Sequence, residues 1–143
     1  MILSNANKGY EMRKHPLKGK LLSFLLLLVP GICIAAPDTA MNKMELTKLI
    51  TGNTLVGSHL IKNHKFHMYM KKDGTHVEKR NGTILPGKWS VNPKGQLCWG
   101  YDIKTKTWCR WILNNGDGTY TKVKGKHKKV RQFKVVSGNS TNL

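Results

Sequence analysis

Two cysteines with aromatic neighbours are the residues whose types and spacing first suggest chemistry. Cys98 and Cys109 lie eleven positions apart in LCWGYDIKTKTWCRW, close to Trp99 and Trp108. A zinc site would need further Cys or His residues at ligand spacing, and haem attachment would need a CxxCH motif. A thiol nucleophile would need a partner histidine. We therefore predict a disulfide between Cys98 and Cys109, with two free thiols as the alternative.

The same pair sets a strand register. If Cys98 faces Cys109 across a hairpin, Trp99 faces Trp108 and Leu97 faces Arg110. Closing a loop of this size stabilises a chain by about 3 kcal/mol in the chain-entropy model. The cysteines are thus expected to staple a hairpin and to take no part in a reaction.

Four histidines, His59, His64, His67 and His76, form the next cluster. His64 and His67 are three positions apart, so on one strand they point to opposite faces. His67 and His76 could face each other across a hairpin at Asp73-Gly74, which would give two metal ligands at most. We predict no metal site and expect these histidines on the outer face of a sheet.

Signals for catalysis are weak throughout the chain. Gly57-Ser58-His59 lacks the second glycine of a nucleophile elbow. The acids that follow residue 35 lie mostly in expected turns or at a helix, and neither a phosphate loop nor a dinucleotide fingerprint is present. We predict a protein that is not an enzyme, with no catalytic residues and no cofactor.

The strongest functional signal is positive charge near the C-terminus. Between residues 122 and 134 there are seven Lys and Arg and no acid. We predict a two-stranded ribbon whose basic face attracts polyanions by releasing their counterions. Its candidate binding residues are Lys122, Lys124, Lys128, Lys129 and Arg131. The alternative is a solvated basic face without a ligand.

The N-terminus is typical of an export signal. Basic residues 13–20 precede the apolar run 21–34, and Ala35-Ala36-Pro37 follows. This order predicts a secretory signal peptide over residues 1–35, starting at Met1 or Met12. The apolar run is shorter than the roughly 20 residues of a membrane-spanning helix, so no span is expected after cleavage. The mature chain would be secreted or periplasmic and would keep 20 Lys and Arg against six Asp and Glu.

The spacing of turn-forming residues after residue 52 predicts an antiparallel β-protein. Turn signals recur about every ten residues, and the segments between them alternate apolar and polar. We expect a helix segment over 36–52 with its helix at 38–50, a disulfide-stapled β-domain over 53–137 and a C-terminal tail over 138–143. The expected strands are 54–61, 64–71, 75–80, 84–91, 96–102, 106–113, 118–124 and 128–136. Eight such strands favour an up-and-down, lipocalin-like barrel, with a curved open sheet as the alternative.

An ordered set of short motifs resembles a bacterial family. Gly52-Asn53-Thr54, Asp73-Gly74, Gly87-Lys88-Trp89 and Leu97-Cys98-Trp99 occur in sequence, and Cys109 follows. The pattern resembles small secreted or periplasmic bacterial proteins of unknown function, over about residues 51–140. The resemblance implies bacterial export and brings no catalytic residues.

Two functions from different classes follow. The first is an exported binding module that contacts an anionic envelope or host polymer, or a lipid headgroup, through the basic hairpin. The second is a lipocalin-like carrier of a small ligand, or an inhibitor with a protein partner, that uses the barrel interior or mouth. The expected interior residues are Phe66, Met68, Trp89, Trp99 and Tyr101, and plain core packing is the alternative role for them.

Overall fold

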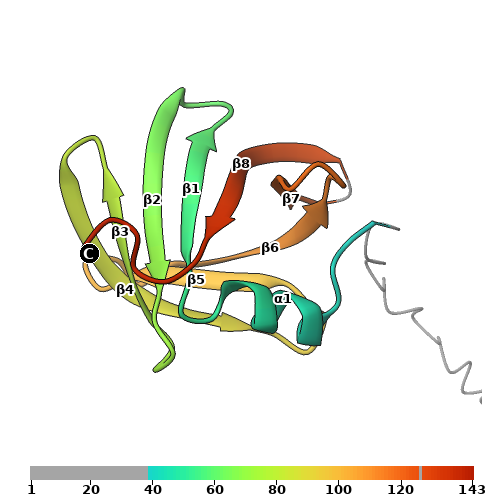
Figure 1. Cartoon of the computed structure of the whole chain (residues 1–143), viewed down its shortest axis with the longest axis horizontal. Helices are drawn as coiled ribbons and strands as arrows, with labels where there is room; N and C mark the ends of the chain where they lie inside the picture. The colour runs from blue at the N-terminus through green and yellow to red at the C-terminus, as the bar shows by residue number, and fades with distance from the viewer. Residues whose placement is uncertain (1–38, 126) are drawn as a thin grey trace, which may run out of the picture. The chain divides into compact units, whose positions relative to one another are not determined.

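A computed structural model describes residues 39–125 and 127–143 of the chain and shows a closed barrel of eight antiparallel strands (Figure 1). Each strand pairs with the next along the sequence, and the last pairs with the first. The strands are β1 (Thr54–His59), β2 (His64–Met70), β3 (Thr75–Arg80), β4 (Thr83–Val91), β5 (Leu97–Tyr101), β6 (Thr107–Asn114), β7 (Tyr120–Lys124) and β8 (Lys128–Val136). The prediction of an up-and-down barrel is confirmed. The predicted signal peptide lies outside the described residues.

Apolar residues at every second position of a strand point into the barrel. In β2, Phe66, Met68 and Met70 are fully buried, whereas His67 and Tyr69 between them are partly exposed. The turn between β3 and β4 has residues that suit its backbone conformation. Asn81 and Gly82 both adopt left-handed backbone, with φ of 49° and 81°, as a two-residue turn between twisted strands requires.

Closure of the barrel depends on one close approach between β1 and β8. Gly57 faces Phe133 across this pair, and a Cβ placed on Gly57 would lie 2.0 Å from the carbonyl oxygen of Gln132. Only glycine fits at this contact. Strand β1 can therefore pair with β8 along the whole length of β1.

The helix α1 (Lys43–Ile50) is shorter than the predicted 38–50. Its boundary follows from a capping box: Asn42 accepts a hydrogen bond from the Glu45 backbone N–H at 2.9 Å, and Glu45 accepts one from Asn42 N–H at 3.3 Å. Leu46 and Ile50 are fully buried in the core. Met44, in contrast, is 80 % exposed.

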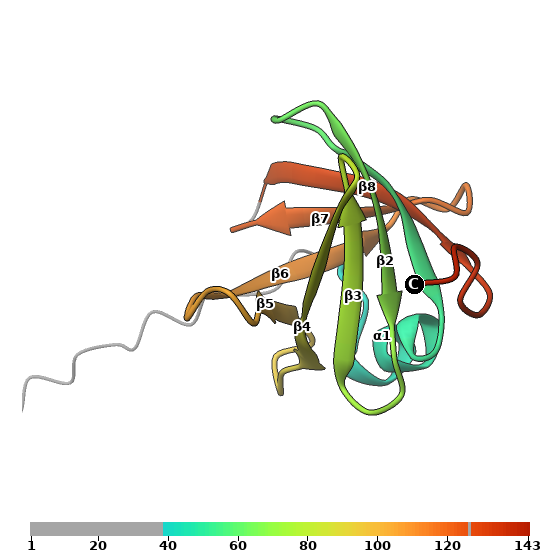
Figure 2. The ribbon, with the colours of Figure 1, turned by 90° about the vertical axis from the view of Figure 1, so that its left-hand side faces the viewer.

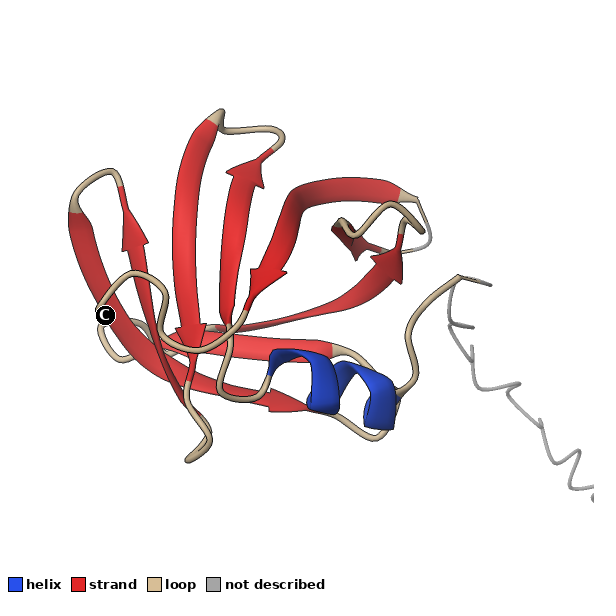
Figure 3. Ribbon diagram, viewed as in Figure 1, coloured by secondary structure: helices blue, strands red, loops and turns tan. Residues whose placement is uncertain are grey.

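Helix α1 covers one end of the barrel (Figures 2 and 3). Backbone hydrogen bonds join the chain just after α1 to the end of β2, at 2.7 Å for Gly52 N–H to Met70 O and 2.9 Å for Met70 N–H to Asn53 O. The C-terminal tail binds at the same place, where the Thr54 hydroxyl donates to Gly138 O at 2.6 Å. This closed end, which we call the helix end, is opposite the β1–β2 loop (Figure 2).

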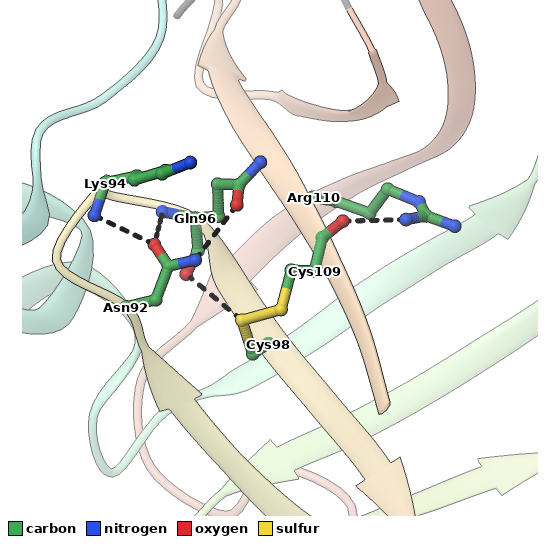
Figure 4. The surroundings of a disulfide bond; sticks show 6 residues. All are labelled: Asn92, Lys94, Gln96, Cys98, Cys109 and Arg110. Atoms are coloured by element: carbon green, nitrogen blue, oxygen red, sulfur yellow. Dashed lines mark hydrogen bonds between the residues drawn. A yellow bond between two sulfur atoms is a disulfide. The ribbon is translucent and has the colours of Figure 1, made fainter. Parts of the chain in front are cut away.

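The predicted staple is present. Cys98 and Cys109 form a disulfide between β5 and β6 (Figure 4). The register is the predicted one, with Trp99 opposite Trp108 and Leu97 opposite Arg110. In the part of the chain that the structure describes, no helix is long and apolar enough to cross a membrane.

Candidate ligand-binding cavity

A cavity of about 470 Å³ occupies the barrel end opposite α1, which we call the mouth end. Its walls come from the strand ends that meet the β1–β2, β3–β4 and β5–β6 loops, and from β7 and β8. The lining residues are His59, Lys62, His64, Arg80, Asn81, Trp99, Tyr101, Lys104, Trp108, Arg110, Lys122, Val130 and Arg131. Six of them are Lys or Arg, two are His, and none is Asp or Glu. The cavity is therefore strongly electropositive.

Lys122 and Arg131 form the inner part of this basic lining. They face each other across β7 and β8 and are almost completely buried, with 0 % and 5 % of their surfaces exposed. Each lies two positions from an inward aromatic residue, Tyr120 on β7 and Phe133 on β8, so strand alternation directs both side chains into the barrel. The prediction that they belong to an exposed basic face is wrong.

The other three residues of the predicted polyanion site lie elsewhere. Lys124, Lys128 and Lys129 are exposed at the ends of β7 and β8, and Lys124 faces Lys128. A register shift after Lys122 separates this outer cluster from the inner pair. The structure thus divides the predicted site into an outer cluster of three lysines and an inner pair.

Glu78 on β3 carries the negative charge that faces the inner pair. It is fully buried and accepts hydrogen bonds from the Tyr101 hydroxyl and from Arg131, the latter at 3.2 Å. Burial by itself raises the pKa of Glu78, but Arg131 and the hydrogen bond from Tyr101 outweigh it and hold the pKa below the ordinary value. Glu78 is therefore ionised at neutral pH. Sequence reasoning overlooked it, because the acids were expected in turns.

Lys122 has no matching partner. Its Nζ atom lies 4.4 Å from the centre of the Trp99 ring and 5.5 Å from that of Phe133, and it makes no hydrogen bond to any residue that the structure describes. Burial, and secondly the charge of Arg131, lower the pKa of Lys122 to about 7. A buried ammonium beside a guanidinium is costly unless an anion compensates it.

Aromatic side chains form the apolar wall of the cavity. The Trp108 ring lies 6.3 Å from that of Trp99 and 5.7 Å from that of Tyr101, centre to centre. Of the predicted interior residues, Trp99 and Tyr101 line the cavity, whereas Phe66 and Met68 belong to the buried core. Trp89 is partly buried against that core, and its indole N–H donates to Lys71 O at 3.0 Å.

The disulfide supports this wall (Figure 4). Cys109 lies between Trp108 and Arg110, both of which line the cavity, and its carbonyl oxygen accepts a hydrogen bond from Arg110 Nη1 at 2.7 Å. Cys98 precedes Trp99. The staple therefore fixes the two strands that carry these side chains.

Two histidines lie at the rim of the cavity. His59 and His64 face each other across β1 and β2, with ring centres 5.1 Å apart. His59 Nδ1 accepts from the backbone N–H groups of Ile61 and Lys62 at 3.3 and 3.2 Å. Burial, then the charge of Arg131, lower the pKa of His59 to about 4, so it is neutral at pH 7.

The remaining histidines correct a sequence prediction. His67 faces Lys79 and His76 faces Met70, so His67 and His76 do not take up the arrangement that the sequence allowed. His76 also points inward, being 1 % exposed, and its Nε2–H donates to Gly100 O at 3.0 Å. Within residues 39–125 and 127–143, no cluster of three or more His, Cys, Asp or Glu could hold a metal ion.

Comparisons of the chain with protein-family models, with curated proteins and with solved structures find no match. The resemblance to exported bacterial proteins stays a prediction. Function must be argued from the cavity itself.

Proposed function

We propose that this protein is a non-enzymatic binding protein that holds a small anionic ligand in the mouth of its barrel. The observation that carries the proposal is the cavity lining, which has six Lys and Arg side chains and no acid. Glu78 balances only part of this charge, and it lies beneath the cavity in contact with Arg131. An anion in the cavity would supply the missing countercharge.

Arg80 and Arg110 are the groups that would meet such a ligand first. Both line the cavity and are only partly buried. Guanidinium groups bind carboxylate, sulfonate or phosphate with paired hydrogen bonds. Lys122 and Arg131 would add their charges from beneath, where the interior screens them less than water does.

The aromatic wall indicates the rest of the ligand. Trp99, Trp108 and Tyr101 offer flat apolar surface beside the cationic groups. A volume of about 470 Å³ suits a compact organic molecule, since small-molecule sites span roughly 300–1,000 Å³. The favoured class is an organic anion with a planar or apolar body.

The test uses 1-anilinonaphthalene-8-sulfonate, an aromatic sulfonate whose fluorescence rises in an apolar site. We expect one-to-one binding that weakens with added salt and that falls at least about tenfold in an Arg80→Gln, Arg110→Gln double variant. A Lys43→Gln, Lys94→Gln double variant, which removes two exposed lysines outside the cavity, is the matched charge control and should bind like wild type. Equal binding of the uncharged parent compound, or unchanged binding by the double variant, would contradict the proposal.

Polyanion binding at the outer surface is a second candidate. The observation that favours it is the exposure of Lys124, Lys128 and Lys129, although the cluster is smaller than the sequence suggested. A triple Gln variant should elute from heparin at lower salt than wild type. Elution at the same salt would exclude this cluster as a polymer site.

Export also belongs to the proposal. The Cys98–Cys109 disulfide supports it, because such bonds persist in oxidising compartments. Mass spectrometry of the protein recovered from its native compartment should find a chain that starts near residue 36. An intact N-terminus on that protein would contradict cleavage.

A further inference from the structure

Exposed apolar side chains gather at the mouth end. The most exposed are Ile61, at 57 %, in the β1–β2 loop and Ile103, at 70 %, in the β5–β6 loop. Leu60 adjoins Ile61 and is 46 % exposed, and Ile84 is half exposed at the start of β4. Four of the six large hydrophobic side chains that are exposed in the described residues therefore lie at this end.

Lysines follow these apolar residues directly. Lys62 comes after Ile61, Lys104 comes after Ile103, and Lys106 completes the second loop, all of them exposed. The residues Leu60, Ile61, Lys62, Ile103, Lys104 and Lys106 form what we call the mouth face. Lys62 and Lys104 also line the cavity, so the mouth face borders its opening. Asp102 is the single acid in the two loops.

We propose that the mouth face docks on the surface of an anionic lipid bilayer. Lysines would contact the lipid headgroups, and Ile61 and Ile103 would enter the boundary between headgroups and acyl chains. A dissolved polyanion would use the lysines alone, because it has no apolar layer to receive the isoleucines. The paired apolar and basic residues on both loops therefore favour a bilayer over a polymer.

Docking in this orientation goes beyond ligand binding, because it places the cavity opening against the membrane. An anionic amphiphile could then pass between the bilayer and the cavity without crossing bulk water. The docking surface and the cavity use different side chains for their main contacts. Each can therefore be tested while the other is intact.

The experiment measures co-sedimentation of the protein with vesicles of equal parts phosphatidylcholine and phosphatidylglycerol. We expect wild type to bind these vesicles at least about tenfold more tightly than vesicles of phosphatidylcholine alone. An Ile61→Ser, Ile103→Ser double variant, which changes no charge, should bind at least about tenfold more weakly than wild type. No binding by wild type, or equal binding by the double variant, would overturn the proposal.

Met44→Ser is the control for the loss of an exposed apolar side chain. Met44 lies on α1 at the helix end and is 80 % exposed, so its removal deletes a similar apolar side chain away from the mouth face. We expect it to bind vesicles like wild type. Equal loss of binding in Met44→Ser and in the isoleucine variant would overturn the proposal, since it would show adhesion without a defined face.

Dye binding separates this proposal from the cavity proposal. The isoleucine double variant should still bind 1-anilinonaphthalene-8-sulfonate with wild-type affinity, which also shows that it is folded. Loss of vesicle binding in Lys124→Gln, Lys128→Gln, Lys129→Gln but not in the isoleucine variant would overturn docking and identify a polymer-type charge cluster. That result would leave the cavity proposal standing.

Discussion

The two ends of this barrel differ in what fills them, although the same strands run between them. On β5 the inward residues are Leu97 toward the helix end and then Trp99 and Tyr101 toward the mouth. On β6, Ile112 is fully buried in the core, whereas Arg110 lines the cavity. Along one strand, the inward residues are therefore apolar at the helix end and aromatic or charged at the mouth end. The helix end stabilises the fold, and the mouth end is where we propose that a ligand binds.

This difference has an energetic reason. At the helix end, Leu46 and Ile50 of α1 cover the apolar core, and burial of such side chains is favourable without any partner. At the mouth end, Glu78, Lys122 and Arg131 are buried with more positive than negative charge. A protein selected for stability alone would replace them with apolar residues. Their presence is what points to a ligand.

Removing Glu78 should produce the largest change. Glu78→Gln leaves Arg131 and Lys122 buried without their countercharge, so we expect the free energy of unfolding to fall by about 3–5 kcal/mol. Urea unfolding measures the effect, and Glu45→Gln, at an exposed position of α1, is the control. A loss below about 1 kcal/mol would show that the buried charges are well solvated, and the two ends would then differ less than we propose.

Truncating Leu46 should weaken the fold from the other end. Leu46→Ala removes a fully buried side chain and should cost about 2–5 kcal/mol. We expect the folded variant to keep wild-type affinity for 1-anilinonaphthalene-8-sulfonate, because the cavity does not include α1. A tenfold or greater loss of dye affinity at a temperature where the variant is folded would contradict the independence of the two ends.

The disulfide should contribute about as much as one core side chain. A Cys98→Ser, Cys109→Ser variant should lose about 3 kcal/mol of unfolding free energy, since the loop is short. Because Trp99, Trp108 and Arg110 adjoin the staple, dye affinity should fall as well. Unchanged dye affinity in the folded variant would show that the strands hold the cavity wall unaided.

Lys122→Met gives the most specific effect, because its size should change with pH. With its pKa lowered to about 7, Lys122 releases a proton on folding between about pH 7 and about pH 10.5, so the unfolded chain binds more protons there. Wild-type stability should therefore rise relative to the variant as pH increases above 7, by at most about 1.4 kcal/mol per pH unit. The advantage of the variant should be greatest below pH 7. A constant difference between about pH 6 and about pH 9 would contradict a buried, titrating Lys122.

The sequence predicted the barrel well because local signals repeat along it. Turn residues such as Asn81-Gly82 mark each hairpin, and the Cys98–Cys109 pair gives a register that the structure confirms. The ends of the strands and of the helix were predicted less accurately. Strand β1 ends at His59 where residue 61 was expected, and α1 begins after Asn42 because the capping box decides its start.

The candidate site could be predicted only in part. Trp99 and Tyr101 were expected inside the barrel, and they line the cavity. We expected Lys122 and Arg131 at the surface, because charged side chains are usually exposed. The alternation of residues along the strands was given less weight. Their spacing of two from Tyr120 and Phe133 carried the correct signal. Glu78 had no local signal, since its partners Tyr101 and Arg131 come from distant strands.

The central claim is that the cavity at the mouth end, and not the outer cluster of lysines, holds an anion. A crystal structure with bromide, located by its anomalous scattering, tests this most directly. We expect a strong bromide peak in the cavity, within contact distance of Arg80 or Arg110 and near Lys122. Bromide found only beside outer lysines such as Lys124 and Lys128, with an empty cavity, would contradict it.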